Sequence, residues 1–180
     1  MSFKSSRKGA FFVPINQTHK YMETYNHFDF GQTIADHIAG IDHYLKASSE
    51  QDPEDLNSQI SQLSGTLLIA VDGKDSTYEY HQASVLSQVS SYCFLILSQT
   101  EAGNPDSVYA AQYVGQTLAE EIICELLRHY EAETRGLGDL IPDSFETHGI
   151  GPMGDCYHGI LLSYDVRQEL TYSRNPDLWQ

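Results

Sequence analysis

One long amphipathic helix, predicted over residues 104–133, constrains the fold of this chain more than any other part of its sequence. Asn104 is a favourable N-cap, Pro105 a favourable first helical residue, and Asp106 lies in the first turn, where the helix dipole favours an anion. The residues predicted to be buried recur every three or four positions: Ala111, Val114, Leu118, Ile122 and Leu126, with Ala119, Ile123 and Leu127 beside them. We therefore expect a long helix laid across a sheet.

The segments on either side of this helix supply the predicted strands. Three β-rich runs precede it, "GTLLIAVDG" (65–73), "STYEYHQ" (76–82) and "SSYCFLILSQ" (90–99), and "DGKD" predicts a hairpin between the first two. After a glycine-rich breaker at 135–144, Ile160, Leu162, Tyr164 and Val166 alternate with polar residues. That period indicates a strand with one covered face.

The first third of the chain is less regular. Ile34, Ile38, Ile41 and Leu45 are spaced as on an amphipathic helix over 30–46, and Asp52 with Pro53 predicts a short helix through Leu63. Residues 1–28 have no sustained period and are predicted to form an arm, which lies either on its own domain as a strand or on a neighbouring subunit.

Together these elements predict one α+β domain over residues 29–180. Its sheet is expected to be mostly antiparallel and four- to five-stranded, packed by two main helices, in the order helix, three strands, long helix, strand. The sequence shows no alternating βαβ pattern and no internal repeat.

The stretch "GIGPMGD" (149–155) has the G-x-G-x-x-G spacing of a dinucleotide-binding loop. That fingerprint needs a helix N-terminus after the loop to hold a pyrophosphate, and a second strand further on. A strand pattern follows Gly154 instead, and too little chain remains for a βαβ unit. We expect no cofactor here, but a turn or bulge that leads into the last strand.

Charge and cysteine usage narrow the function classes. The formal net charge is -15, so a groove that grips nucleic acid is not expected. The odd number of cysteines, three, and their wide spacing argue against a disulfide framework, and apolar neighbours predict that all three are buried free thiols. The longest apolar run, residues 92–97, is too short to cross a membrane.

Two groups of residues have side chains of the types that bind metals. His37 and His43 are six residues apart, which places them on different faces of one helix. His148, Cys156 and His158 are closer, but Cys156 and His158 would share the apolar face of the last strand. We expect structural histidines and no metal.

Catalysis has little support in the sequence. There is no G-x-S-x-G motif, and the serines fall in stretches such as "SVLSQVSS" (84–91) that are predicted to be surface. Asp155 with Cys156 and His158 is the best nucleophilic combination, but neighbouring residues of a strand point to opposite faces. We therefore expect the protein not to be an enzyme.

The stretch "FETHGIGPMGDCYHGILLSYDV", the closing "NPDLW", and the strand followed by a long helix at 90–127 together resemble small structural proteins encoded beside tail genes in prophages and phage-tail-like particles. The resemblance covers residues 65–179. It implies the tail-terminator and head-to-tail connector group: small α/β proteins that assemble as rings, usually sixfold, cap the tail tube or join it to the neck, and catalyse nothing. It also implies a turn opening the last strand, formed by Gly151, Pro152, Gly154, Asp155, Tyr157 and Gly159.

The resemblance leads to one expected function and two alternatives. The expected protein is a noncatalytic subunit of a tail-terminator or connector ring, expected to be hexameric, that contacts tail tube, sheath or neck proteins. It would be assembled in the cytoplasm and become part of a virion or tail-like particle. Tyr78, Tyr80, Tyr109 and Tyr113 are expected to add aromatic surface, which interfaces favour. The alternatives are a small acidic binding or adaptor module and a metal- or cysteine-dependent enzyme.

Overall fold

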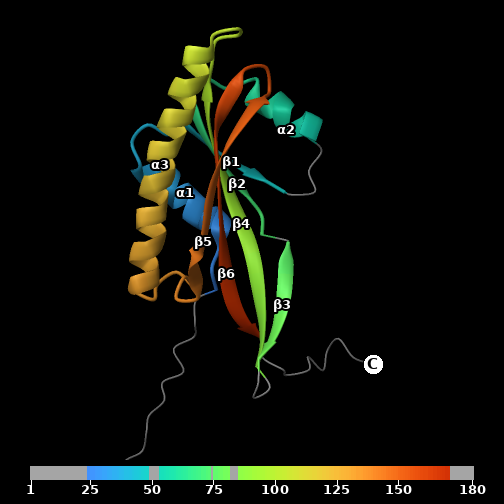
Figure 1. The fold of residues 1–180 in the computed structure, drawn as a ribbon, viewed down its shortest axis with the longest axis vertical. Coiled ribbons are helices and arrows are strands. Elements are labelled where there is room, and N and C mark those ends of the chain that lie inside the picture. Colours follow the sequence, from blue (N-terminus) through green and yellow to red (C-terminus); the bar gives the residue numbers. More distant parts are fainter. Residues whose placement is uncertain (1–23, 49–52, 74, 82–84, 171–180) are drawn as a thin grey trace, which may run out of the picture.

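A computed structural model of the chain describes residues 24–48, 53–73, 75–81 and 85–170, so residues 1–23 of the predicted arm (1–28) lie outside these ranges. The fold is α+β, as predicted, with helices packed on a mixed sheet (Figure 1). In chain order the elements are α1 (His27–His37), β1 (His43–Ala47), α2 (Pro53–Ile60), β2 (Thr66–Val71), β3 (Ser76–His81), β4 (Val85–Gln99), α3 (Pro105–Glu131), β5 (Leu140–Met153) and β6 (Tyr157–Leu170).

Within the described ranges the sheet has six strands, whereas four or five are predicted. Its order is β1-β2-β4-β6-β5, and β3 pairs with β4. Among the described pairs β1 and β2 run parallel and the other pairs are antiparallel. The extra strands arise from β1 and from β5, which begins at Leu140, inside the predicted breaker.

The predicted hairpin between β2 and β3 is wrong. Both strands pair with the same edge of β4, β2 with residues 93–98 and β3 with residues 85–90. They follow one another along that edge, so the "DGKD" segment interrupts a strand course and does not reverse it. The described part of β4 is also longer than predicted, and its serines Ser87 and Ser90 are buried, not on the surface.

The predicted helix over 30–46 is correct only in its first half. α1 ends at His37, and Gly40 takes a left-handed conformation with φ +97°, which glycine adopts without steric cost. The chain then enters β1, where Leu45 pairs with Ile69 of β2 and packs on the opposite side of the sheet from Ile34. The helical spacing of the four apolar residues therefore arises from two different elements.

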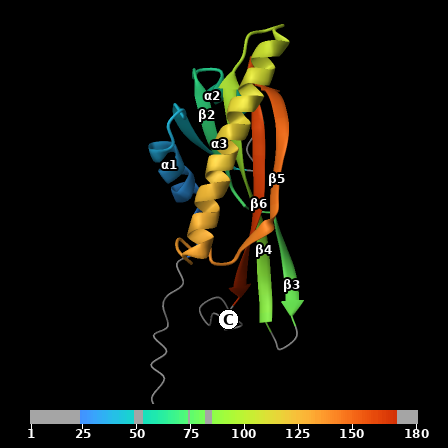
Figure 2. The same ribbon diagram turned by 60° about the vertical axis from the view of Figure 1, so that its left-hand side comes forward.

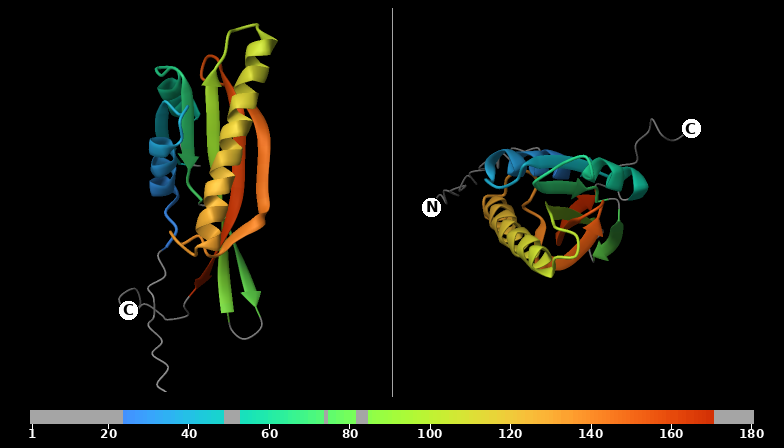
Figure 3. Two further views of the ribbon diagram at one scale, coloured as in Figure 1. Left: turned by 90° about the vertical axis from the view of Figure 1, so that its left-hand side faces the viewer. Right: turned by 90° about the horizontal axis from the view of Figure 1, so that it is seen from above.

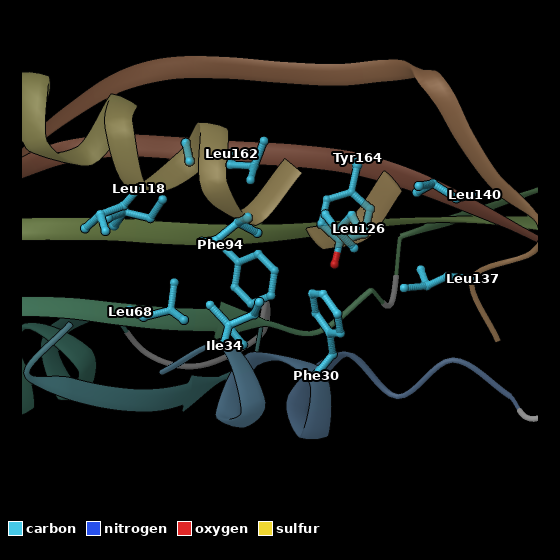
Figure 4. Packing of buried hydrophobic residues seen from close by; sticks show 14 of the residues in the cluster. Phe30, Ile34, Leu68, Phe94, Leu118, Leu126, Leu137, Leu140, Leu162 and Tyr164 are labelled. Atoms are coloured by element: carbon cyan, nitrogen blue, oxygen red, sulfur yellow. The ribbon is translucent and has the colours of Figure 1, made fainter. Parts of the chain in front are cut away.

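Helices cover both faces of the sheet. On one face, α1 and α3 enclose the larger core, in which Phe30 and Ile34 point toward Phe94 of β4 (Figure 4). On the other face, Ile60 of α2 packs with Leu67 and Ile69 in a smaller cluster. Successive residues of the central strands supply the two clusters alternately, as strand geometry requires.

The predicted long helix is present and runs along the length of β4 and β6 (Figure 2). Asn104 caps it, because its side chain accepts the backbone N–H of Asp106 at 3.1 Å. The predicted stripe is wrong at one position: Val114 is 41% exposed, and Gly115 takes its place against the sheet. A Cβ at Gly115 would lie 3.3 Å from the carbonyl oxygen of Ile96, so glycine allows the helix to approach β4 closely.

The domain begins earlier than residue 29. Asn26 caps α1 by accepting the backbone N–H of Asp29 at 3.2 Å, and Tyr25 and His27 are buried in the larger core. These residues fall within the predicted arm, but the structure places them in the domain.

Candidate functional site

The residues that the resemblance singled out lie around the turn between β5 and β6. Gly151 has φ +128° and Gly154 has φ +55°, both in the region that favours glycine. A Cβ at Gly151 would lie 2.5 Å from Cδ2 of His158. The backbone N–H of Gly154 donates to Oδ1 of Asn57 in α2 at 3.0 Å. The "GIGPMGD" stretch therefore shapes and anchors a turn, and the strand β6 follows it as predicted.

These six residues differ in their exposure. Gly151, Pro152 and Asp155 are exposed at the turn, whereas Tyr157 is only 1% exposed and belongs to the smaller core. The Tyr157 hydroxyl donates to the carbonyl oxygen of Leu63 at 2.9 Å, and burial raises its pKa. Tyr157 therefore fixes the turn to the segment that follows α2, whereas Gly151, Pro152 and Asp155 face solvent.

A groove of about 580 Å³ lies between this turn and the start of α3. Its lining includes the acidic residues Glu101 and Asp155 and the apolar or aromatic surfaces of Pro105, Tyr109 and Pro152. The groove therefore offers a concave, acidic and partly apolar surface at the end of the molecule where α3 begins.

The structure does not assemble the nucleophilic combination into a catalytic arrangement. Asp155 and Cys156 lie in the turn and only His158 is in the strand. The Thr100 hydroxyl donates to the carbonyl oxygen of Cys156 at 2.7 Å and is 2.9 Å from Nδ1 of His158. In the part of the chain that the structure describes, no hydrogen bond joins the Cys156 thiol to the His158 imidazole, so the imidazole is not placed as its base.

The candidate metal residues are dispersed. His37 ends α1 while His43 begins β1, so the two residues lie on two different elements and not, as predicted, on different faces of one helix. His148 is exposed and lies 3.4 Å from Glu146. Within the described ranges, no three His, Cys, Asp or Glu side chains are grouped so that they would hold a metal ion.

The prediction of three buried thiols is wrong. Cys124 is exposed on α3, and Cys93 and Cys156 are half-buried. Burial raises the pKa of the Cys93 thiol to about 11, so this thiol stays protonated at neutral pH.

Four tyrosines are well exposed, as predicted, and they form two surfaces. Tyr109 and Tyr113 lie one turn apart on α3 beside Val114, with exposed fractions of 69% and 76%; we call these three residues the α3 tyrosine surface. Tyr78 and Tyr80 project from one side of β3 and are 62% and 70% exposed; they form the β3 tyrosine surface. The first turns of α3 and the strand β3 lie toward opposite ends of the molecule (Figure 1), so the two surfaces are far apart.

A buried polar cluster is not predictable from the sequence pattern. Nε2 of His27 donates to the carbonyl oxygen of Cys93 at 3.0 Å, which leaves Nδ1 to accept from one of the two hydroxyls near it, those of Tyr25 (3.1 Å) and Tyr164 (3.0 Å). The two hydroxyls also bond to each other. Burial lowers the pKa of His27 to about 4, so the ring is neutral and satisfied. The cluster fixes the start of the domain to β4 and β6.

No protein-family model and no curated protein sequence matches the chain. None of the helices in the described ranges combines the length and the apolar character that crossing a membrane requires.

Proposed function

We propose that this protein is a noncatalytic structural subunit of a phage tail or phage-tail-like injection particle. In that particle it forms a tail-terminator or connector ring of six subunits at the end of the tail tube or sheath. The observation that carries the proposal is the presence of two exposed tyrosine surfaces, on α3 and on β3. The resemblance of the turn and last strand to tail proteins gives the particle in which such a ring would act.

The tyrosine surfaces favour self-association. Tyrosine is enriched at protein interfaces because its ring supplies apolar area and its hydroxyl accepts or donates a hydrogen bond. The β3 tyrosines stand on a strand that, in the described pairing, bonds to β4 on one side. Exposed strand edges and exposed aromatic residues are both features that a subunit of an assembly covers.

The positions of the surfaces favour a ring over a two-fold dimer. The α3 and β3 tyrosine surfaces are built from different elements and lie toward opposite ends of the domain. A head-to-tail contact, in which one copy uses only its α3 surface and the other only its β3 surface, is heterologous, and heterologous contacts that close produce rings. With a formal charge of -15 per subunit, such a ring is strongly acidic overall, a charge that repels DNA.

The test is the native mass of the purified full-length chain, measured across protein concentration, together with negative-stain images. We expect one closed oligomer of six subunits, with a central opening. A chain that stays monomeric at all concentrations and binds no tail-tube or sheath protein would contradict the proposal. That result would favour an acidic binding or adaptor module, for which the groove beside the β5–β6 turn is the available concave surface.

A further inference from the structure

The outward side of α3 carries a narrow stripe of exposed side chains, which are acidic or aromatic except for one cysteine. At 100° per residue, its members fall within roughly 60° of arc and extend over about 38 Å of helix. These residues, here called the outer stripe, are Asp106, Tyr109, Tyr113, Glu120, Cys124 and Glu131, and all are exposed. In the described part of the chain, no helix or strand lies on the side of α3 that faces away from the sheet (Figure 3).

The outer stripe has little positive charge of its own. Arg128 lies next to it, but its guanidinium is engaged in a two-point hydrogen-bonded ion pair with Glu125. That interaction also lowers the pKa of Glu125. The Glu120 carboxylate accepts a hydrogen bond from Nε2 of Gln116 at 3.1 Å, but no described Lys or Arg side chain forms an ion pair with Glu120 or Glu131. Both carboxylates can therefore bind a cationic partner, and the faces of Tyr109 and Tyr113 suit cations and other aromatic rings.

The chain itself contains a segment of complementary chemistry. Residues 1–23 carry four of the ten Lys and Arg residues and one of the 25 acidic residues, so this short segment is basic while the rest of the chain is strongly acidic. Lys4, Arg7 and Lys8 precede the apolar run of Phe11, Phe12 and Val13. Eleven extended residues, 3–13, measure about 36 Å, which matches the length of the outer stripe.

The position at which the described chain begins favours binding of residues 3–13 to the α3 helix of a neighbouring copy. Phe30, near the start of α1, packs against His129 in the last turn of α3, with ring centroids 5.9 Å apart. Tyr109 is twenty residues from His129, or about 30 Å along the helix. A coil of twelve residues spans roughly 20 Å, so Phe11 and Phe12 reach the α3 tyrosines of their own chain only with a stretched connection.

The start of the described chain also lies beside the segment that leads to β3. Thr24 and Tyr25 line one pocket with Asp72 and Gly73, which precede β3. In each copy, the N-terminal segment therefore joins the domain close to the residues that lead to the β3 tyrosine surface.

We propose that residues 3–13 of one copy lie along the outer stripe of α3 in the next copy. Lys4, Arg7 and Lys8 lie beside Glu120 and Glu131, and Phe11 and Phe12 lie beside Tyr113. This inference rests on the proposed ring, since the donor and the acceptor are different subunits.

The test uses the native thiol in the stripe. In the proposed arrangement residue 6 lies near Cys124, so the full-length Ser6→Cys protein, oxidised with diamide, should form disulfides between the introduced thiol of one subunit and Cys124 of the next. We expect a ladder of covalent multimers on a denaturing gel without reductant, which collapses to monomer on reduction. The matched control, Ser6→Cys with Cys124→Ser, keeps Cys93 and Cys156 and should give no ladder.

The outcomes separate the docking from the ring itself. Native mass of the same sample reports whether the ring is present. A ring without the Cys124-dependent ladder would overturn the docking and leave the ring proposal standing. A disulfide within one chain would show that the segment lies on its own helix and would also overturn the docking. A strict monomer would overturn both.

Discussion

His27 illustrates how one side chain joins the start of the domain to its sheet. Its ring is 4% exposed, lies 4.4 Å from the ring of Phe94 between centroids, and bonds through both nitrogens. Because burial lowers its pKa to about 4, the folded protein holds it neutral across the range in which a free imidazole takes up a proton.

This lowered pKa predicts a pH dependence of stability. Between pH 6.5 and about 4 the unfolded chain binds a proton at His27 that the folded chain does not. The contribution of His27 is therefore fully present above pH 6.5 and is lost as the pH falls toward 4, by about 3 kcal/mol. Urea unfolding of the wild type and of His27→Gln at several pH values between 4.5 and 7.5 measures this contribution to the free energy of unfolding.

The expected result is a smaller loss of unfolding free energy on acidification in His27→Gln than in the wild type, whatever the absolute stability of the variant. Burial also lowers the pKa of His129, but this residue is present in both proteins and its effect cancels in the difference. If the free energy of unfolding fell equally with pH in the two proteins, His27 would not be held neutral in the folded state.

At the scale of elements, the close approach of β4 and β6 depends on Gly159. A Cβ at this position would lie 1.9 Å from the carbonyl oxygen of Ile96, a distance that backbone atoms cannot relieve without moving a strand. Gly159→Ala should therefore lower the free energy of unfolding by at least about 2 kcal/mol. Gly138→Ala, whose Cβ would be 3.7 Å from Glu133, is the matched control and should change it by less than about 0.5 kcal/mol. Equal urea midpoints for the two variants would contradict this account of the sheet.

The elements that are predicted best from the sequence have local signals. α3 follows from the Asn104 cap, Pro105 and a long helical period, all of which depend on neighbours in the chain. The prediction is wrong at Val114 because the helical period does not decide whether Val114 or Gly115 faces the sheet. The sheet decides that position, since Gly115 fits against Ile96 and Ile160 where a larger side chain does not.

The elements that the sequence does not reveal depend on long-range pairing. β1 exists because it pairs with β2. The residues "IDHYLKA" (41–47) do not themselves exclude a continued helix, and the local signal against one is the preceding Gly40. The β2–β3 hairpin is predicted from "DGKD" alone, whereas β4 is long enough to pair with both strands in turn. In the candidate site, the turn and the exposed tyrosines are predictable from composition. The His27 cluster is not, because its partners are 66 and 137 residues away.

At the scale of the whole molecule, the features relevant to assembly lie on the outside of the described domain. Helices α1 and α3 cover one face of the sheet and α2 covers part of the other, while the α3 and β3 tyrosine surfaces remain exposed. We propose that these surfaces meet between neighbouring copies, head to tail. Because the two surfaces are distinct, each is blocked by its own substitutions without disturbing the other.

The most direct test is the native mass of an equimolar mixture of two variants, Tyr109→Ser/Tyr113→Ser and Tyr78→Ser/Tyr80→Ser. Each variant alone lacks one half of every contact between the two tyrosine surfaces and should be monomeric. In the mixture, the intact β3 surface of the first variant meets the intact α3 surface of the second, so we expect a one-to-one heterodimer and no ring. Dimers formed by either variant alone, or a mixture in which both remain monomers while the wild type forms rings, would contradict a head-to-tail contact between these surfaces.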